Sequence, residues 1–252
     1  MSSRNVLPPP AANDGIAGHS GCELAELFTG KDSSYTDVYP LGSFKDMPGA
    51  LQDFIRDHGA PHTLMSDNAK ANISQEMVKV LRFYNIKGQT STPKQQNQNP
   101  AERRIQDIKH MTDSIMDCTH APAPYWLLCT LFVCSLYNVL SLHKLGGKSP
   151  EQMLTNQVPD ISPFLAYRWW EPVYYHEPDS KFPSETRERL GRWIGPAKDC
   201  GDIMTFNILD AQTGLLVKKS VLCPALDNQN INLRAELDLL ASLDGESTAV
   251  TE

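Results

Sequence analysis

The stretch at residues 90–109, TSTPKQQNQNPAERRIQDIK, decides the fold that we expect for this chain. A polar, amide-rich loop leads into a helix with a well-marked start. Asn99 suits the N-cap, Pro100 the first helical position and Glu102 the N3 position. Apolar positions then recur at helical spacing and form one face of the helix. They are Ile105, Ile108, Thr112 and Ile115. The stretch therefore predicts an amphipathic helix that begins at Pro100.

A different face of this helix carries polar groups in a row. Glu102, Gln106 and Lys109 are spaced i, i+4 and i+7, which places them side by side on a helix. A carboxylate, an amide and an ammonium suit a surface that meets a metal ion and a phosphate backbone. A glutamate at N3 also has a purely structural explanation, because it completes a capping box and faces the helix dipole.

A second carboxylate lies upstream, where Asp67 follows the apolar run at residues 62–66. An Asp-Asn pair after a strand is by itself mainly a turn signal. However, a carboxylate at a strand end and another at a helix start can converge beyond the carboxyl edge of an α/β sheet. Such a pair can hold Mg²⁺ for phosphodiester chemistry. Asp67 and Glu102 are therefore candidate metal ligands.

The length and the charge of the chain limit how many domains it can contain and how widely it can bind nucleic acid. At 252 residues and 40% hydrophobic content, the chain suits one large domain, or a medium domain with a small companion. A net charge of −7 argues against a protein that coats nucleic acid over its whole surface. Residues 79–109 nevertheless hold seven Lys and Arg against two acids. This basic middle permits a local nucleic-acid site.

Six cysteines without a CxxC pair indicate thiols in a reducing compartment, and His19 with Cys22 is too little for a zinc site. The apolar run at residues 125–140 is too short to span a bilayer and is expected to be a buried helix. No signal peptide is recognisable. We expect a soluble nuclear or cytoplasmic protein that has no contact with a membrane.

The order of the expected elements is that of an α/β domain followed by a β-rich one. Expected strands lie at 22–28, 37–41, 62–66 and 90–92, and expected helices at 44–58, 72–84, from 100, at 125–140 and at 150–156. Short alternating runs follow from about residue 158. We predict four segments: 1–19, disordered; 20–157, an α/β core; 158–226, a small β-barrel; and 227–252, an acidic disordered tail.

Several motifs resemble the integrase core of copia-type retrotransposons. SDNAKAN at 66–72 and TPKQQNQNPAERRIQDIK at 92–109 resemble its SDN, its TP-x-x-x-QN loop and the AE that opens its catalytic helix. The segments at 21–41, 146–164 and 181–209 resemble its second and third strands, its last helix and the β-barrel that follows. The matches occur in the family's order, over roughly residues 20–226.

The resemblance implies a ribonuclease-H-like core, a mixed sheet with flanking helices, and the DDE class of polynucleotidyl transferases. In that class three acids bind two Mg²⁺ (or Mn²⁺) ions, trim the ends of the element's cDNA and join them to target DNA, within a multimer. Asp67 matches the second acid and Glu102 the third. The remaining matches are nucleic-acid-binding residues of the loop and of the helix: Gln96, Asn97, Arg103, Gln106 and Lys109.

The chain departs from the family at the first acid, whose position falls near Pro9 and Pro10. Prolines remove ladder donors, so we predict that the first strand is missing or degenerate and that the core is N-terminally truncated. Asp14 lies in a turn-like sequence, while Asp32 and Asp37 are expected surface charges. We therefore expect an integrase core that is inactive in this form. The alternative is a domesticated, non-catalytic module that binds nucleic acid or protein.

Overall fold

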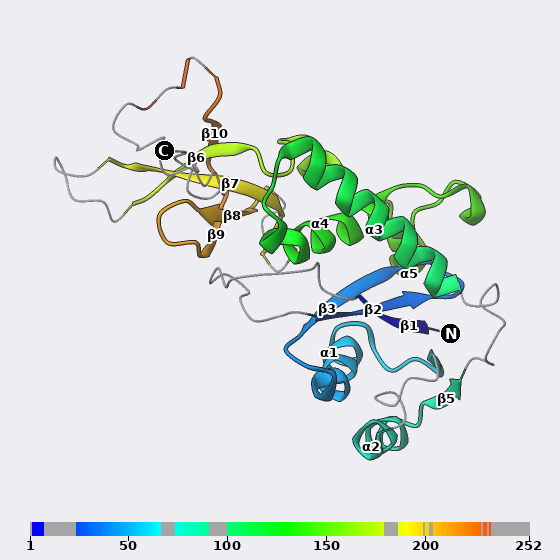
Figure 1. Cartoon of the computed structure of the whole chain (residues 1–252). Helices are drawn as coiled ribbons and strands as arrows, with labels where there is room; N and C mark the ends of the chain where they lie inside the picture. Colours follow the sequence, from blue (N-terminus) through cyan, green and yellow to red (C-terminus); the bar gives the residue numbers. More distant parts are fainter. Residues whose placement is uncertain are drawn as a thin grey trace, which may run out of the picture. The chain divides into compact units, whose positions relative to one another are not determined.

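The computed structural model describes residues 2–7, 24–66, 74–90, 100–178, 186–198, 200–201, 204–227, 229–230 and 232 (Figure 1). For residues 2–7 the description covers the backbone alone. The chain divides into two compact units. The first is built mainly from residues 21–113 and 130–160, and the second mainly from residues 114–129 and 161–252.

Unit 1 contains a five-stranded mixed sheet of order β3-β2-β1-β4-β5. Strand β2 runs antiparallel to both β1 and β3, whereas β4 runs parallel to both β1 and β5. The strands are β1 (Ser2–Leu7), β2 (Leu24–Gly30), β3 (Thr36–Leu41), β4 (Thr63–Ser66) and β5 (Lys87–Thr90). The mixed α/β architecture that the sequence predicts is therefore present.

Strand β1 corrects the expectation that residues 1–19 contain no regular structure. It lies in the centre of the sheet, pairing from Ser2 to Leu7 with β2 and from Ser2 to Arg4 with β4. These pairings are made by backbone groups with partners far along the chain, so the local sequence gave no sign of them. The strand ends where the prolines at 8–10 begin, because proline cannot donate to a ladder. Residues 8–23, including Asp14, His19 and Cys22, lie outside the described part.

The helices of unit 1 pack apolar stripes against this sheet. A 3₁₀ turn, η1 (Phe44–Asp46), leads into α1 (Met47–His58), and α2 is Gln75–Phe83. Helix α1 ends as the sequence predicts, at Gly59, whose φ is 83° and whose N–H donates to Ile55 O at 2.8 Å. The shared core comprises Phe28, Tyr39, Leu41, Met47, Ala50, Leu51, Ile55, Leu64, Met77, Val80 and Ile86.

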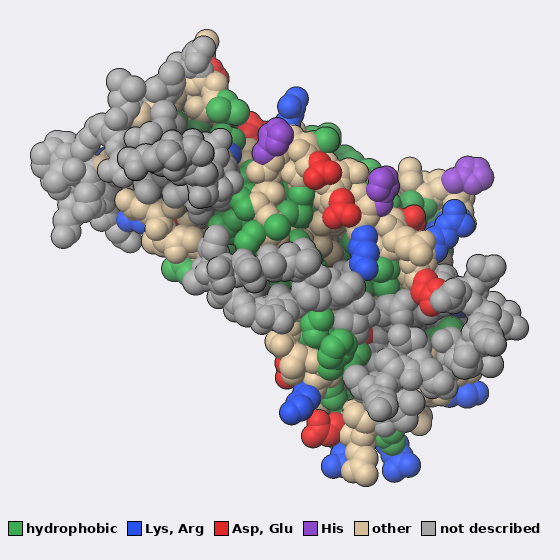
Figure 2. All heavy atoms as spheres, viewed as in Figure 1, with side chains coloured by type: hydrophobic (Ala, Val, Ile, Leu, Met, Phe, Trp, Pro, Cys, Tyr) green, Lys and Arg blue, Asp and Glu red, His purple; other side chains and the backbone are tan. Residues whose placement is uncertain are grey.

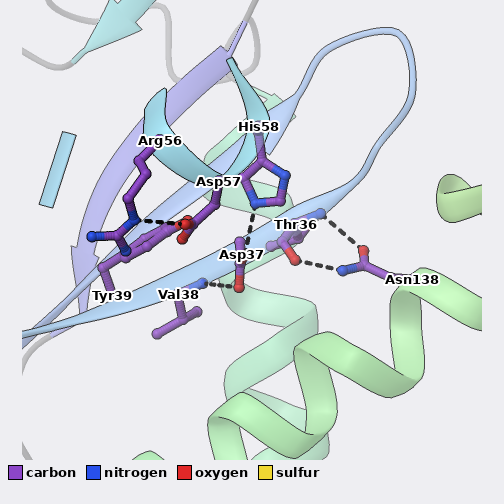
Figure 3. Close-up of polar contacts among 8 residues, drawn as sticks. All are labelled: Thr36, Asp37, Val38, Tyr39, Arg56, Asp57, His58 and Asn138. Atoms are coloured by element: carbon purple, nitrogen blue, oxygen red, sulfur yellow. Dashed lines mark hydrogen bonds and ion pairs between the residues drawn. The ribbon is translucent and has the colours of Figure 1, made fainter. Parts of the chain in front are cut away.

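Polar contacts fix the end of α1 to strand β3 (Figure 3). His58 Nε2 lies 2.9 Å from Asp37 Oδ2, and the Tyr39 hydroxyl donates to Asp57 Oδ2 at 3.1 Å. Arg56 Nε donates to the other oxygen of Asp57 at 3.0 Å. Asp37 is only partly exposed and is paired with a histidine, so a structural role accounts for it.

Further helices follow β5. They are α3 (Pro100–Thr119), η4 (Ala123–Tyr125), α4 (Trp126–Val139), η5 (His143–Leu145), α5 (Pro150–Thr155) and α6 (Ser162–Leu165). No residue of α4 is exposed, which confirms the predicted buried helix. Across the described segments, no single helix is both long and apolar enough to cross a membrane. One bent pair, Ala123–Val139 with His143–Thr155, meets the criteria of length and composition only when taken together.

Unit 2 contains an antiparallel five-stranded sheet of order β10-β6-β7-β8-β9. Its strands are β6 (Pro172–His176), β7 (Glu188–Pro196), β8 (Phe206–Asp210), β9 (Leu216–Lys219) and β10 (Leu222–Pro224). The predicted β-rich segment is therefore present. Among the strands described, no pairing joins β9 to β10, so closure into a barrel stays a prediction.

Close packing explains the glycine that opens the sequence GRWIGP in β7. A Cβ added at Gly191 would lie 2.5 Å from Ile208 Cγ2 and 2.8 Å from Leu209 O, so no larger residue fits against β8. The fully buried Trp193 follows two positions later and contacts the ring of Phe206. The predicted acidic tail lies almost wholly outside the described residues. Asn232 Nδ2 donates to Glu188 Oε2 at 2.7 Å.

Candidate functional site

Helix α3 places the predicted site residues on its outer side while its other face is buried. Ile105 and Ile108 are buried, as is Thr112, which matches the stripe read from the sequence. Glu102 lies in the first turn and is half-buried. A carboxylate there is stabilised by the positive end of the helix dipole. This contribution exists whether or not Glu102 also binds a metal ion.

Three further predicted residues of α3 are exposed, and all lie in its first half. Arg103, Gln106 and Lys109 face solvent, where their side chains can reach phosphate groups. Figure 2 shows basic, acidic and histidine side chains along the helix that Figure 1 labels α3. The exposed charges of the second half are acidic, at Asp113 and Asp117. The exposed Lys and Arg side chains of α3 therefore lie in its first half alone, together with the exposed carboxylate of Asp107.

The neighbouring arginine is not part of this surface. Arg104 is buried, and its guanidinium carbon lies 4.8 Å from the centre of the Tyr137 ring, over its face. A cation in this position is stabilised by the ring quadrupole. Of the two consecutive arginines, therefore, only Arg103 is available to a ligand, while Arg104 joins α3 to α4.

A lysine that sequence reasoning missed lies in the same electrostatic environment. Lys144 belongs to η5 and is exposed. Partial burial of its ammonium lowers the pKa of Lys144, and the positive charges of Arg104 and Arg103 lower it further, against an opposing effect of Asp107. Lys144 therefore adds to the positive potential near Arg103. Its sequence context, HKLGGK at 143–148, is a basic loop with two glycines, which is a weak signal when read alone.

The other predicted residues lie outside the described part of the chain: Asp67, Gln96 and Asn97. The strand before Asp67 is described, and its last residue, Ser66, pairs with Arg4 of β1 and with Thr90 of β5. The sequence of β1, SSRNVL, contains no acidic residue. Searched over the described residues only, the chain has no cluster of three His, Cys, Asp or Glu side chains that could hold a metal ion.

The described cysteines form no disulfide and no metal cluster. Cys129 and Cys134 are buried in α4, Cys118 is exposed, and Cys200 and Cys223 are partly exposed; all five are free thiols.

No protein-family model and no curated protein matches the sequence, whereas solved structures show similarity to it. One similar structure is the simian T-cell lymphotropic virus intasome in complex with PP2A regulatory subunit B56 gamma. Its matched chain is 15% identical with a TM-score of 0.47, over 90% of this chain and 81% of its own length. Another is the HTLV-2 integrase catalytic core domain in complex with magnesium, in a trimeric form. It is 19% identical with a TM-score of 0.45, over 61% of this chain and 94% of its own length.

Proposed function

We propose that unit 1 is an integrase-type, ribonuclease-H-like core of the copia kind, which binds DNA through the first half of α3 and is inactive in DNA integration. One observation supports this proposal. The segments that resemble the copia-type motifs coincide with strands β2, β3 and β4 and with the start of helix α3, in the order in which the family has them. The segment that resembles the family's second and third strands contains β2 and β3. SDN begins with the last residue of β4, and the AE pair lies in the first turn of α3.

The expected loss of activity rests on strand β1. Two-metal phosphodiester chemistry uses acidic ligands to hold one ion at the attacking oxygen and one at the leaving oxygen. Strand β1 lies beside β4 in the sheet but offers no carboxylate. Asp67 and Glu102 alone do not make a complete two-metal site, so no metal-dependent step is assigned to this chain. Two carboxylates still suffice to bind a single Mg²⁺ or Mn²⁺ ion.

DNA is the proposed partner because the exposed cations and amide of α3 suit a phosphate backbone. Arg103 and Lys109 supply charge, and Gln106 between them supplies a neutral donor. In the proposed arrangement Gln96 and Asn97 contact the same DNA from the loop before α3. Self-association into a homo-oligomer and a nuclear or cytoplasmic location belong to the same proposal.

The second candidate is a non-catalytic module that binds nucleic acid or protein. The acid-free sequence of β1 favours it, because a chain selected only for binding has no need of that ligand. The two candidates differ in metal dependence. A metal-binding remnant uses Asp67 and Glu102 together, whereas a binding module uses neither.

Thermal unfolding with and without Mn²⁺ or Mg²⁺ tests the metal site without requiring activity. At a metal concentration of 100 times the Kd, binding stabilises the folded protein by about 2.7 kcal/mol. We expect this stabilisation in the native sequence and its loss in Asp67→Asn and Glu102→Gln. Asp113→Asn is the matched control, because Asp113 is an exposed carboxylate on the same helix. It should respond to metal as the native protein does.

Each result separates the candidates. If metal fails to stabilise the native chain, or stabilises Asp67→Asn equally, the metal site is absent and the binding module is the better description. Detection of strand transfer by the purified chain would contradict the proposed inactivity. Lys109→Ala should weaken duplex binding, while Asp117→Ala should not.

A further inference from the structure

The most exposed large apolar side chain of the described residues is Phe83, the last residue of α2. Its exposed fraction is 81%. Its one described aromatic contact is the ring of Tyr84, which it meets edge-on at a centroid distance of 4.9 Å and an interplanar angle of 82°. Isolated exposed apolar residues are common and need no explanation. The surroundings of Phe83 are what distinguish it.

The end of α2 fixes the direction in which Phe83 points. Ile86 N–H donates to Leu81 O at 2.8 Å and Asn85 N–H donates to Arg82 O at 3.2 Å, while Asn85 has a φ of 53°. This is the hydrogen-bond pattern of a Schellman cap, in which a left-handed residue closes the helix. Ile86 is buried and Leu81 packs against the core. Since successive helical residues are rotated by about 100°, Phe83 points away from the core.

Cations flank this ring on the same helix. Lys79 and Arg82 are exposed and precede Phe83 by four residues and by one. Residues three or four apart are neighbours on a helix surface, so Lys79 lies beside both Arg82 and Phe83. Lys87, also exposed, opens the edge strand β5 directly after the cap. Figure 2 shows basic side chains beside apolar atoms in the region where Figure 1 places α2.

We propose that Lys79, Arg82 and Phe83 form a binding surface for single-stranded nucleic acid, separate from α3. The phosphates contact the two cations and an unpaired base stacks on the Phe83 ring. Proteins that bind single strands combine these same two elements, a basic track and an aromatic platform. A duplex hides the faces of its bases, so it can use the cations but not the ring. The proposal requires neither Asp67 nor Glu102 and stands independently of the function proposed above.

Fluorescence anisotropy of the full chain tests this surface, with labelled single-stranded DNA, single-stranded RNA and a duplex of equal length. EDTA is present, so that any metal-dependent binding at α3 is removed. We expect Phe83→Ala to weaken single-strand binding about tenfold, the effect of losing one base–aromatic stack. Duplex binding should change little. The two single strands show whether the surface prefers DNA or RNA.

Matched variants distinguish the contribution of the Phe83 ring from that of the Arg82 cation. Phe44→Ala removes another exposed phenylalanine, in η1, and should bind as the native chain does. Arg82→Ala should reduce the salt dependence of single-strand binding by about 0.7 in the log–log slope, as expected for one lost phosphate contact. Arg56→Ala removes an arginine that is already paired with Asp53 and Asp57, and should leave the slope unchanged.

Phe83→Leu distinguishes a stacked base from a docked apolar partner, because leucine keeps the apolar area but has no aromatic face. We expect it to bind single strands as weakly as Phe83→Ala. Native-like binding by Phe83→Leu would overturn base stacking in favour of an apolar protein contact. The proposal is also overturned if the native chain does not bind single strands, or if Phe83→Ala and Arg82→Ala bind as it does. A thermal melt of each variant establishes that it is folded.

Discussion

At the scale of single residues, Asp210 connects β8 to the turn that follows it. Its carboxylate accepts hydrogen bonds from Gln212 N at 2.9 Å, from the N–H and hydroxyl of Thr213 at 2.5 and 2.8 Å, and from the Tyr175 hydroxyl. The residue is 1% exposed. Burial acts to raise the pKa of Asp210, but the hydrogen bonds from Tyr175 and from the turn outweigh it and hold the pKa below the ordinary value of an aspartate.

The sign of this shift sets a prediction about acid stability. Since the pKa of Asp210 is lower in the folded chain than in the unfolded one, its contribution is complete above the unfolded value and is lost as the pH falls through the folded value. Asp210→Asn should lower the free energy of unfolding at neutral pH by about 1–3 kcal/mol, because asparagine keeps only one acceptor oxygen and the donors to the other lose their acceptor. Urea unfolding at neutral and acid pH measures this.

Urea unfolding at acid pH also allows a comparison with a control variant. Native unit 2 should lose stability more steeply below pH 4 than the Asp210→Asn variant does. Asp227→Asn changes an exposed aspartate that accepts one backbone N–H, from Gln229 at 3.0 Å, and should keep the native pH dependence. An equal acid response in Asp210→Asn and the native chain would show that Asp210 does not govern acid stability.

At the scale of elements, α4 protects the free edge of the sheet at β3. Asn138 Oδ1 accepts from Thr36 N at 2.9 Å, and Asn138 Nδ2 donates to Thr36 O at 2.7 Å (Figure 3). Strand β3 is the outer strand of the sheet, and both residues are buried. An unpaired edge is a site for pairing with another chain, so one amide side chain replaces the missing neighbour.

Asn138→Ala should therefore leave two buried backbone groups of Thr36 without partners. Each unsatisfied buried group costs about 1–3 kcal/mol, so we expect about 2–6 kcal/mol of destabilisation in denaturant unfolding. Amide hydrogen exchange gives a local measurement. The Thr36 amide should exchange faster, whereas the Gly30 amide, which bonds to Tyr35 O at 2.8 Å, should keep its protection. Unchanged exchange at Thr36 would show that Asn138 is not its essential partner.

Elements with local signals could be predicted from the sequence, and elements without them could not. The start of α3 at Pro100 and the end of α1 at Gly59 follow from capping preferences that act within one turn. Strand β1 was missed because its stability comes from partners at β2 and β4, remote in sequence. The segment expected to be extended at 90–92 overlaps β5 (Lys87–Thr90), which begins directly after the cap of α2, and residues 91 and 92 lie outside the described part.

The same distinction holds for the candidate site. Helical spacing correctly predicted that Gln106 and Lys109 are exposed while Ile108 is buried. Spacing also places Arg104 four residues before Ile108 on the buried face, but the contact of Arg104 with Tyr137 in another helix could not be predicted from the sequence. Lys144 reaches the neighbourhood of Arg103 through tertiary structure alone.

At the scale of the whole molecule, the charge of the chain opposes the binding proposed for it. The net charge is −7, yet residues 79–109 hold seven Lys and Arg against two acids. Residues 233–252 hold five acids and one arginine. Unit charges in water interact with energies on the order of 1 kcal/mol at close range, and salt screens them beyond about 10 Å at 0.1 M. A negative segment can therefore weaken binding of a polyanion without touching it.

Deletion of residues 233–252 raises the net charge from −7 to −3 and should tighten duplex DNA binding. We expect a gain of a few-fold, on the order of 1 kcal/mol, at low salt. The gain should vanish near 1 M salt, where the screening length falls to about 3 Å. Anisotropy titrations over a salt series measure it.

A tail whose acids are changed to Asn and Gln keeps the length and removes the charge, so it should reproduce the gain if electrostatics is the cause. Weaker binding by the deleted chain would instead indicate that the tail itself contacts DNA. A gain on deletion that the neutral tail does not reproduce would indicate steric cover of the basic surface. Because the exposed cations of α2 and of the first half of α3 both lie within residues 79–109, a charge effect should act on single-stranded and duplex binding alike. Steric cover of one surface should act on only one of them.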